Sequence, residues 1–334
     1  MEELEPELKG IGYTYVVGIS GISSSGKTTL ARHLQRLFTN LTIPISPISQ
    51  PGAASNVVGK ISFNISLLHE DDFFFPESSL PVRRVAIKHQ GSKHEEPEET
   101  VDMVDWDFPG AINFRALKKA LRLLNQGVPY AEVLHCMGIK ETEGPEPVEV
   151  QPDAAPKGGV VISEAALAEI RKVIISKLNK DVEQIPKTLR KSFWINLILV
   201  DGFMLYHRDG DEAEQTSPTL ASLLDLKLLL RAPYAVAKGR RESRNGYHTA
   251  DGFWTDPPGY FDGIVWPNYV QYHRHLFVEG DVDAGTLTDE WGPKGKGVEL
   301  QPGHEGMEDL LRWASGKIVD VIAGAWINYL GQPH

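Results

Sequence analysis

Cysteine is almost absent from this sequence of 334 residues, in which Cys136 is the only one. A single cysteine cannot form an intramolecular disulfide, which excludes the class of small secreted domains held together by disulfides. The first ten residues, MEELEPELKG, are acidic, whereas a secretory signal begins with basic residues and continues with apolar ones. We therefore expect a reducing, cytoplasmic location.

Long uncharged apolar segments and clusters of basic residues are also missing. The most apolar helical candidate, 307–330, carries Glu308, Asp309 and Arg312, which a bilayer core would penalise. The formal net charge is −11, and no basic stripe is present that could neutralise a phosphate backbone. We expect no membrane span and no nucleic-acid partner. A monomer that acts on a small molecule is the remaining prediction.

A glycine-rich segment follows the first apolar run of the chain. Residues 21–29 read GISSSGKTT, which is the P-loop spacing of two glycines, a lysine and a hydroxyl residue. In this motif backbone N–H groups surround a polyphosphate, Lys27 reaches the β- and γ-phosphates, and the Thr28 hydroxyl binds Mg²⁺. The nucleotide-binding residues predicted from it are Gly21, Ser23, Ser24, Ser25, Gly26, Lys27, Thr28 and Thr29.

The apolar patterns around this loop predict an α/β fold with a mainly parallel sheet. Strands are expected at 13–20, 61–68, 193–200 and 224–230. Helices are expected after the P-loop and at 113–126, 163–180, 234–244, near 267–277 and at 307–330. We predict one domain over 1–334, with surface inserts at about 42–60, 83–100, 141–180 and 286–304.

Three carboxylates follow predicted strands, where ligands gather in open α/β sheets. Asp71 and Asp72 end one strand and Asp201 ends another. Each could instead be a turn residue or a helix N-cap. Beside a P-loop, oxygen ligands for Mg²⁺ are the better interpretation.

Arginines and aromatic residues supply the remaining candidates. Arg240, Arg241 and Arg244 lie on a predicted helix, where they suit a migrating phosphoryl group or, alternatively, a solvated helix face. Trp106 and Tyr260 lie in DWDFP and DPPGYFDG, and such rings serve either to bind a ligand or to pack.

Taken together, the motifs resemble those of the nicotinamide riboside kinases, in the uridine-kinase-like group of P-loop kinases. The resemblance covers somewhat over half the chain. It rests on GISGISSSGKTTLA, HEDDFF, DWDFP, LVDGFMLY, LRAPYAVAKGRRESR and DPPGYFDGIVWPNY.

That resemblance implies a three-layer α/β/α nucleoside kinase fold. It also implies transfer of the γ-phosphate of ATP, with Mg²⁺, to the ribose 5′-hydroxyl of nicotinamide riboside, for NAD synthesis. The implied catalytic residues are Asp71, Lys27 and Arg240. The implied metal-site residues are Thr28, Asp71 and Asp201, and Arg240 and Arg244 would bind ATP from a lid at about 239–262. The implied substrate residues are Asp71, Asp72, Phe74, Trp106, Asp107, Arg241 and Tyr260.

Several alternatives stay open at this point. Gly239 interrupts a run that is often more basic in the family, and the inserts have no counterpart in its compact pattern. The sequence leaves open ATP or GTP as donor, and nicotinic acid riboside as a second substrate. A uridine or cytidine kinase, or a non-catalytic P-loop protein that binds partners through its inserts, would carry the same loop.

Overall fold

A six-stranded sheet forms the centre of the protein. The computed structural model describes residues 11–45, 59–87, 99–139, 162–183, 192–208, 219–243, 247–249, 252–303 and 306–330. The sheet order is β10-β7-β1-β6-β3-β2, and all neighbours are parallel except β2 and β3. The strands are β1 (Ile11–Gly21), β2 (Thr42–Ile45), β3 (Gly59–His69), β6 (Phe193–Gly202), β7 (Leu226–Leu230) and β10 (Val298–Leu300). The predicted mainly parallel sheet is confirmed.

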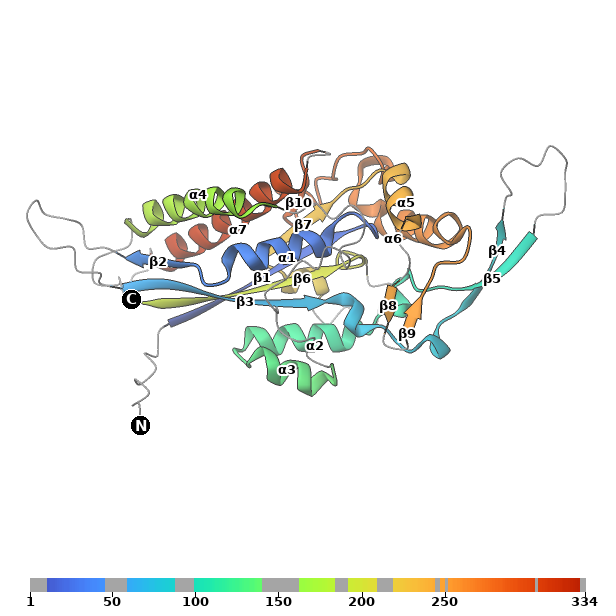
Figure 1. The fold of residues 1–334 in the computed structure, drawn as a ribbon, viewed down its shortest axis with the longest axis horizontal. Helices are drawn as coiled ribbons and strands as arrows, with labels where there is room; N and C mark the ends of the chain where they lie inside the picture. Colours follow the sequence, from blue (N-terminus) through green and yellow to red (C-terminus); the bar gives the residue numbers. More distant parts are fainter. Residues whose placement is uncertain are drawn as a thin grey trace, which may run out of the picture.

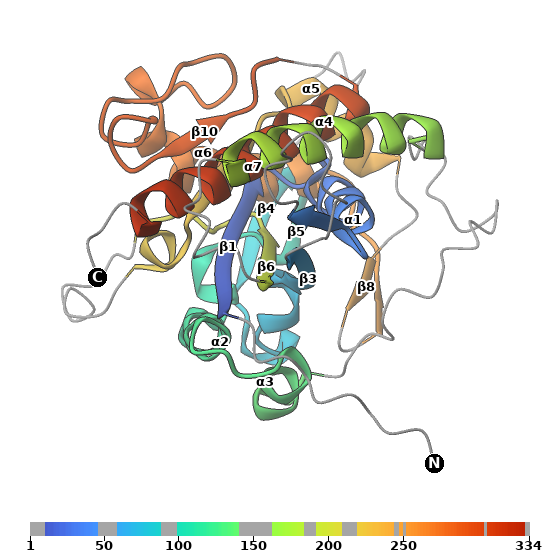
Figure 2. The ribbon, with the colours of Figure 1, turned by 90° about the vertical axis from the view of Figure 1, so that its left-hand side faces the viewer.

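Helices cover both faces of this sheet, which gives the predicted three layers (Figures 1 and 2). One face carries α1 (Lys27–Phe38), α4 (Glu164–Glu183) and α7 (Met307–Leu330), and the other carries α2 (Phe114–Asn125) and α3 (Tyr130–Met137). Neighbouring strand residues enter opposite cores, so that Val16 packs on the side of α2 and Val17 on the side of α1. Burial on both faces explains why the strands read as continuous apolar runs.

Smaller elements gather at the carboxyl end of the sheet. They are the hairpin β4 (Val82–Ile87) and β5 (Glu99–Val104), helix α5 (Tyr234–Glu242), the short hairpin β8 (Tyr247–Thr249) and β9 (Gly252–Trp254), a π-helical turn η7 (Phe261–Val265), and α6 (Trp266–His273). The β4–β5 hairpin projects from this end of the molecule (Figure 1). The parts of the chain that carry Arg241, Tyr260 and Trp106 therefore lie near the strand ends.

Three of the predicted surface inserts contain regular structure that the sequence reading missed. Residues 42–45 form β2 and β3 begins at residue 59, at the two ends of the first insert. Residues 82–87 and 99–104 pair as an antiparallel hairpin at the two ends of the insert predicted at about 83–100. Residues 298–300 add an edge strand beside β7. Pairing with another strand stabilises each of these segments, and the composition of the segment itself does not reveal that partner.

The insert predicted at 141–180 contributes to the core through α4. Leu167, Ile170, Ile174 and Leu178 are buried along one side of this helix, against α1, α7 and β2. Its Arg171 donates to the carbonyls of Arg36 and Leu37, which lie in the last turn of α1 and have no partner within that helix. Residues 141–161 lie outside the described part of the chain.

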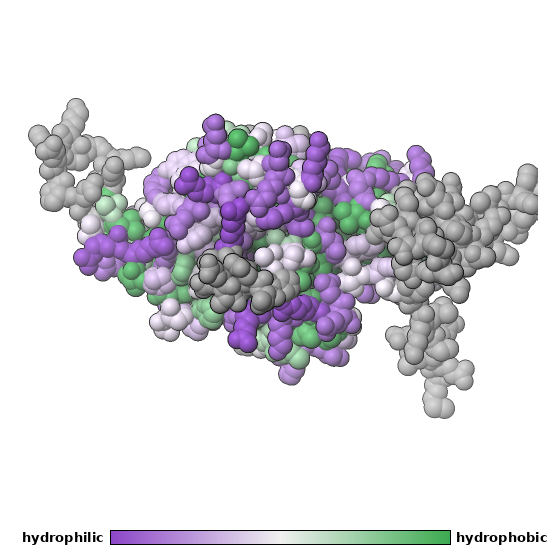
Figure 3. All heavy atoms as spheres, turned by 180° about the vertical axis from the view of Figure 1, so that it is seen from behind, coloured by the Kyte–Doolittle hydropathy of each residue, from purple (hydrophilic) through white to green (hydrophobic). Residues whose placement is uncertain are grey.

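The surface of the described residues mixes polar and apolar side chains. Hydrophilic and hydrophobic residues are interspersed on the face seen in Figure 3. Among the helices within the described ranges, none is long and apolar enough to cross a membrane.

We expect Ile174→Ala to destabilise the fold, because Ile174 is 3% exposed beneath α4. The expected loss is about 2–5 kcal/mol in the free energy of unfolding, measured by chemical denaturation. Val173→Ala is the matched control, because the Val173 side chain, next to Ile174 in the sequence, is 62% exposed. This substitution should change the free energy of unfolding by less than about 0.5 kcal/mol. Equal effects of the two substitutions would contradict the packing of α4.

The stability should also depend on pH through His273, which is fully buried. Its Nδ1 donates to the carbonyl of Tyr269, and its Nε2 has no partner among the described residues. Burial lowers the pKa of His273 to about 3, whereas the pKa of a histidine in the unfolded chain is near 6.5. Between about pH 3 and pH 6.5 the unfolded chain therefore binds more protons than the folded chain. This contribution is complete above about pH 6.5 and is lost as the pH falls, by up to about 1.4 kcal/mol per pH unit. Denaturation curves at pH 7 and pH 5 should therefore differ more for the wild type than for His273→Gln; equal differences would refute the role of His273.

Candidate active site

The P-loop adopts a conformation that requires its glycines. Gly21 has φ 147° and Gly26 has φ 99°, and a Cβ atom on Gly21 would lie 2.2 Å from the carbonyl oxygen of Leu230. Gly26 caps α1, whose N-terminus provides backbone N–H groups for an anion. The buried hydroxyls of Ser24 and Ser25 have no partner among the described residues. These are donors of the kind that phosphate oxygens accept.

The end of the P-loop is joined to the ends of two further strands. The Thr28 hydroxyl donates to Asp201 Oδ2 at 2.6 Å, and Asp201 Oδ1 lies 2.5 Å from His69 Nδ1. His69 is paired with Asp201 in the register of β3 and β6, so the parallel strands end at the same edge. Lys27 Nζ donates to the Ile22 carbonyl at 2.9 Å within the loop. The structure thus brings together the predicted residues Lys27, Thr28 and Asp201.

Electrostatic effects distinguish the carboxylates at this edge. Burial by itself would raise the pKa of Asp201, but the hydrogen bond and charge of His69 outweigh it and lower that pKa. Desolvation by the neighbouring protein and the charge of Asp201 raise the pKa of Asp71 to about 6, although its side chain is exposed at the surface. Burial also raises the pKa of Asp72. Asp201 is therefore the firmly ionised member of the group.

Glu70 is a buried carboxyl group that the sequence reading missed. It is 0% exposed, and its Oε2 accepts hydrogen bonds from the backbone of Phe203 at 2.6 Å and of Met204 at 3.1 Å. A Cβ at Gly202 would lie 2.5 Å from this oxygen, so a glycine at that position makes room for the carboxyl group. Burial raises the pKa of Glu70 to about 8. The contact ties the segment after β6 to the turn that holds Asp71.

On the substrate side, Asp107 is paired with Arg241. The two groups form a bidentate contact at 3.2 and 3.3 Å, and Arg241 also binds Asp256 at 2.7 Å. Both Asp107 and Arg241 are 7% exposed, and the guanidinium lies 5.4 Å from the ring centre of Tyr260. The four residues thus connect α5 and the region predicted as a lid to the segment after β5. A carboxylate has lone pairs for further donors, so pairing with Arg241 leaves Asp107 able to accept from hydroxyls.

Aromatic rings form the adjoining wall. Phe74 contacts Trp106 edge to face at 5.4 Å between ring centres and stacks on Phe203 at 6.1 Å. Trp106 is only 9% exposed and belongs to the core on the side of α2. A base that stacks on this indole would require its neighbours to move, so stacking on Trp106 stays a prediction.

The remaining predicted residues divide into three cases. Arg240 Nη1 lies 3.4 Å from the carbonyl oxygen of Ser24, above the P-loop. Ser23 is half-buried in the loop, and Thr29 is exposed in the first turn of α1. Arg244 lies outside the described residues.

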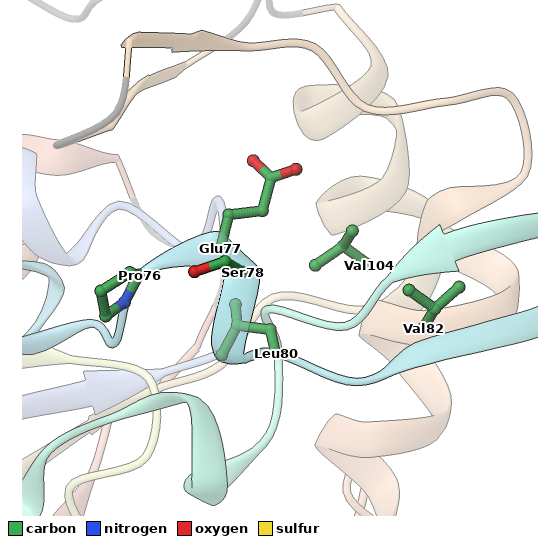
Figure 4. Close-up of a pocket in the computed structure, with 6 residues that line it drawn as sticks. All are labelled: Pro76, Glu77, Ser78, Leu80, Val82 and Val104. Carbon is green, nitrogen blue, oxygen red and sulfur yellow. The ribbon is translucent and has the colours of Figure 1, made fainter.

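A narrow pocket separates the phosphate loop from Asp107. It is lined by Ile22, Ser23, Asp107, Phe203, Met204, Val265 and Tyr269. A second hollow, with a volume of about 560 Å³, lies at the base of the β4–β5 hairpin. Leu80, Val82 and Val104 are among the residues that line it (Figure 4). None of the predicted site residues lines this second hollow.

His69, Glu70 and Asp105 are the residues of this region that sequence reasoning left out. Asp105 is completely buried directly before Trp106, where it contacts Arg83 and Asn268. The segment HEDDFF contains two of the three, but its pattern does not tell which acid points inward. For Glu70 the sequence holds one signal, which is the glycine directly after Asp201. Gly202 leaves room for the Glu70 carboxyl group, as any larger residue would not.

We expect Gly21→Ala to abolish nucleotide binding, because both the backbone angle and the Leu230 carbonyl exclude a side chain. Titration calorimetry with an ATP analogue should give no measurable heat of binding, while circular dichroism reports whether the fold persists. Gly316→Ala in α7 is the matched control, since a Cβ there meets nothing within 4 Å. Tight binding by the Gly21 variant would show that the loop does not hold the phosphates.

Comparison with known proteins gives a consistent result. No protein-family model matches the chain. It is 28% identical to nicotinamide riboside kinase of Schizosaccharomyces pombe, over 92% of this chain and 98% of the relative. It is 30% identical to the Saccharomyces cerevisiae nicotinamide riboside kinase, over 80% and 81%, and 21% identical to human nicotinamide riboside kinase 1, over 79% and 78%. On this similarity, which spans most of both chains, the protein belongs to the nicotinamide riboside kinase family.

Proposed function

We propose that the protein transfers the γ-phosphate of ATP to the ribose 5′-hydroxyl of nicotinamide riboside, and so forms the mononucleotide for NAD synthesis. One observation carries the proposal in this chain. The phosphate loop reaches a narrow pocket through Ile22 and Ser23, and Asp107, which Arg241 holds, lines the same pocket. Asp71 lies at the adjoining strand ends, where the charges of Lys27 and Asp201 act on its carboxyl group.

In this proposal Lys27 and the backbone of the loop bind the β- and γ-phosphates, and Arg240 approaches them from above Ser24. The 5′-oxygen attacks the γ-phosphorus, the bond to the β–γ bridging oxygen breaks, and ADP leaves. Asp71 orients the hydroxyl and takes its proton. Because phosphoryl transfer passes through a loose transition state, alignment of the two oxygens contributes more than the basicity of Asp71.

Mg²⁺ suits the oxygen groups at the strand ends. The Thr28 hydroxyl and the carboxylates of Asp201 and Asp71 are hard donors of the kind that this ion prefers. Within the described residues, no group of three or more histidine, cysteine or acidic side chains could hold a metal ion by itself. Mg²⁺ commonly uses one or two carboxylates together with waters and substrate phosphates. When bound, it would neutralise charge on the phosphates.

The nucleoside would lie between Phe74 and Asp107. The Asp107 carboxylate can accept from two vicinal ribose hydroxyls, with Arg241 holding it in place. Three carboxylates, of Asp105, Asp107 and Asp256, share two guanidinium groups, of Arg83 and Arg241, in this network. The remaining negative charge favours a pyridinium ring, and an indole face adds about 0.5–2 kcal/mol for a cation. Asp72 and Tyr260 complete the proposed substrate residues.

Three further features belong to the proposal. The chain acts as one domain and as a monomer, without nucleic-acid or membrane partners. It works in the cytoplasm. Residues 239–262 form a lid, since Arg240 approaches the phosphate loop while Arg241 contacts the nucleoside side.

Turnover is the direct test. Purified protein with ATP, Mg²⁺ and nicotinamide riboside should release ADP and the mononucleotide, with a higher kcat/KM than for uridine, because uridine lacks the positive charge. Asp71→Ala should lower kcat by about 10²- to 10⁴-fold, and Lys27→Ala should be nearly inactive.

Asp320→Asn is the control for these variants, because this exposed carboxylate pairs with Lys177 on the far helices. A wild type that turns over uridine but not nicotinamide riboside would replace the proposed substrate. A wild type that binds ATP and phosphorylates neither would remove the proposed reaction.

A further inference from the structure

Asp105 is a completely buried carboxylate that no proposed step uses. Arg83 Nε lies 2.6 Å from its Oδ2, and Asn268 Nδ2 donates to both of its oxygens at 2.9 and 3.1 Å. Its Oδ1 also accepts from the backbone N–H of Asp107 at 3.0 Å. A buried charge is costly unless it is paired and hydrogen-bonded, and this carboxylate has both kinds of partner.

These contacts immobilise the backbone that carries Trp106 and Asp107. The N–H of Asp105 donates to the Pro81 carbonyl at 2.9 Å, and the N–H of Trp106 donates to the Tyr260 hydroxyl at 3.1 Å. The N–H of Asp107 donates to Asp105 itself. Each of the three successive N–H groups therefore has a different acceptor, and rotation of this segment would break all three hydrogen bonds.

The partners of Asp105 come from two elements that are linked through the turn η7. Arg83 lies on β4, and Asn268 lies on α6, directly after the turn η7. Exposure alternates along β4, with Arg83, Val85 and Ile87 on its less exposed side. A Cβ on Gly263 of η7 would lie 2.2 Å from Val85 Cγ1, which shows how closely the base of the hairpin approaches this turn.

We propose that Asp105 is a positioning residue for the nucleoside, and that it makes the base of the β4–β5 hairpin part of the substrate site through Arg83. Asp105 does not touch the substrate. It fixes the place of Asp107 relative to the pocket and to Arg241, and so sets how well the ribose is held. This inference rests on the proposed function, because it assigns Asp107 to the nucleoside.

The test measures KM for nicotinamide riboside and for ATP separately. In Asp105→Asn the new amide N–H₂ group would face the donors of Arg83 and Asn268, so the segment should shift. We expect KM for nicotinamide riboside to rise about tenfold while KM for ATP changes by less than about twofold. Asp102→Asn, an exposed carboxylate on the same hairpin that pairs with Arg84, should change neither.

A second pair of variants covers the possibility that Asp105→Asn does not fold. Arg83→Gln removes the positively charged partner of Asp105. The Arg83 side chain is 40% exposed, so the fold should tolerate this change, and KM for nicotinamide riboside should rise in the same selective way. The adjacent Arg84→Gln, on a side chain that is 71% exposed, is its control. A purely structural role would lower the melting temperature and leave both KM values unchanged.

The double variant Asp105→Asn with Asn268→Asp restores a donor facing an acceptor across this contact, and it should recover part of the affinity for the riboside. Unchanged KM values for the riboside in Asp105→Asn or, if that variant does not fold, in Arg83→Gln would overturn the inference. Equal increases for both substrates would do the same. Absence of wild-type turnover with nicotinamide riboside would instead count against the proposed function.

Discussion

The ends of three parallel strands meet at one edge of the sheet, and the whole site depends on that meeting. The P-loop follows β1, the acidic turn follows β3, and Asp201 lies near the end of β6, so that Thr28, His69 and Asp201 come within hydrogen-bonding distance. Parallel pairing in the order β1-β6-β3 places these chain segments together although they are distant in sequence. The apolar contacts on both faces of the sheet hold the strands in this register.

Buried charge organises the site on two levels. At the strand ends, His69 lowers the pKa of Asp201, while desolvation and the charge of Asp201 raise the pKa of Asp71, whose side chain is exposed. Further out, Asp105 and Asp107 are each held by an arginine from a different part of the chain. Such pairs tie loops to the scaffold, because breaking one would leave an unpaired charge in a region that excludes water.

The sequence predicted the features that depend on local patterns. The P-loop has a sequence motif, the strands that are buried on both faces are continuous apolar runs, and helix α4 has apolar residues at helical spacing. Each of these patterns can be recognised within the segment itself. Prediction from the sequence failed where a segment is ordered by pairing or packing against another element. The hairpin of residues 82–87 and 99–104 lies at the ends of a predicted surface insert, yet strand pairing and contact with η7 order it.

The same limit applies to the site. Motifs identified Lys27, Thr28, Asp71 and Asp201, but they did not separate Glu70 from its acidic neighbours or single out Asp105. Backbone donors and the available space decide which carboxyl group turns inward. For Glu70, the N–H of Phe203 is such a donor, and the absence of a side chain at Gly202 leaves the space. Trp106 was predicted as a ligand-binding ring, and its near-complete burial leaves that role open to experiment.

The central claim is that a phosphate chain held around Lys27 and a sugar hydroxyl beside Asp71 are brought into line. A crystal structure with a non-hydrolysable ATP analogue, Mg²⁺ and nicotinamide riboside measures this directly. The account predicts the 5′-oxygen about 3–3.5 Å from the γ-phosphorus, with the Asp71 carboxylate within hydrogen-bonding distance of it. A riboside bound elsewhere, or an Asp71 side chain directed away from the γ-phosphate, would contradict the account.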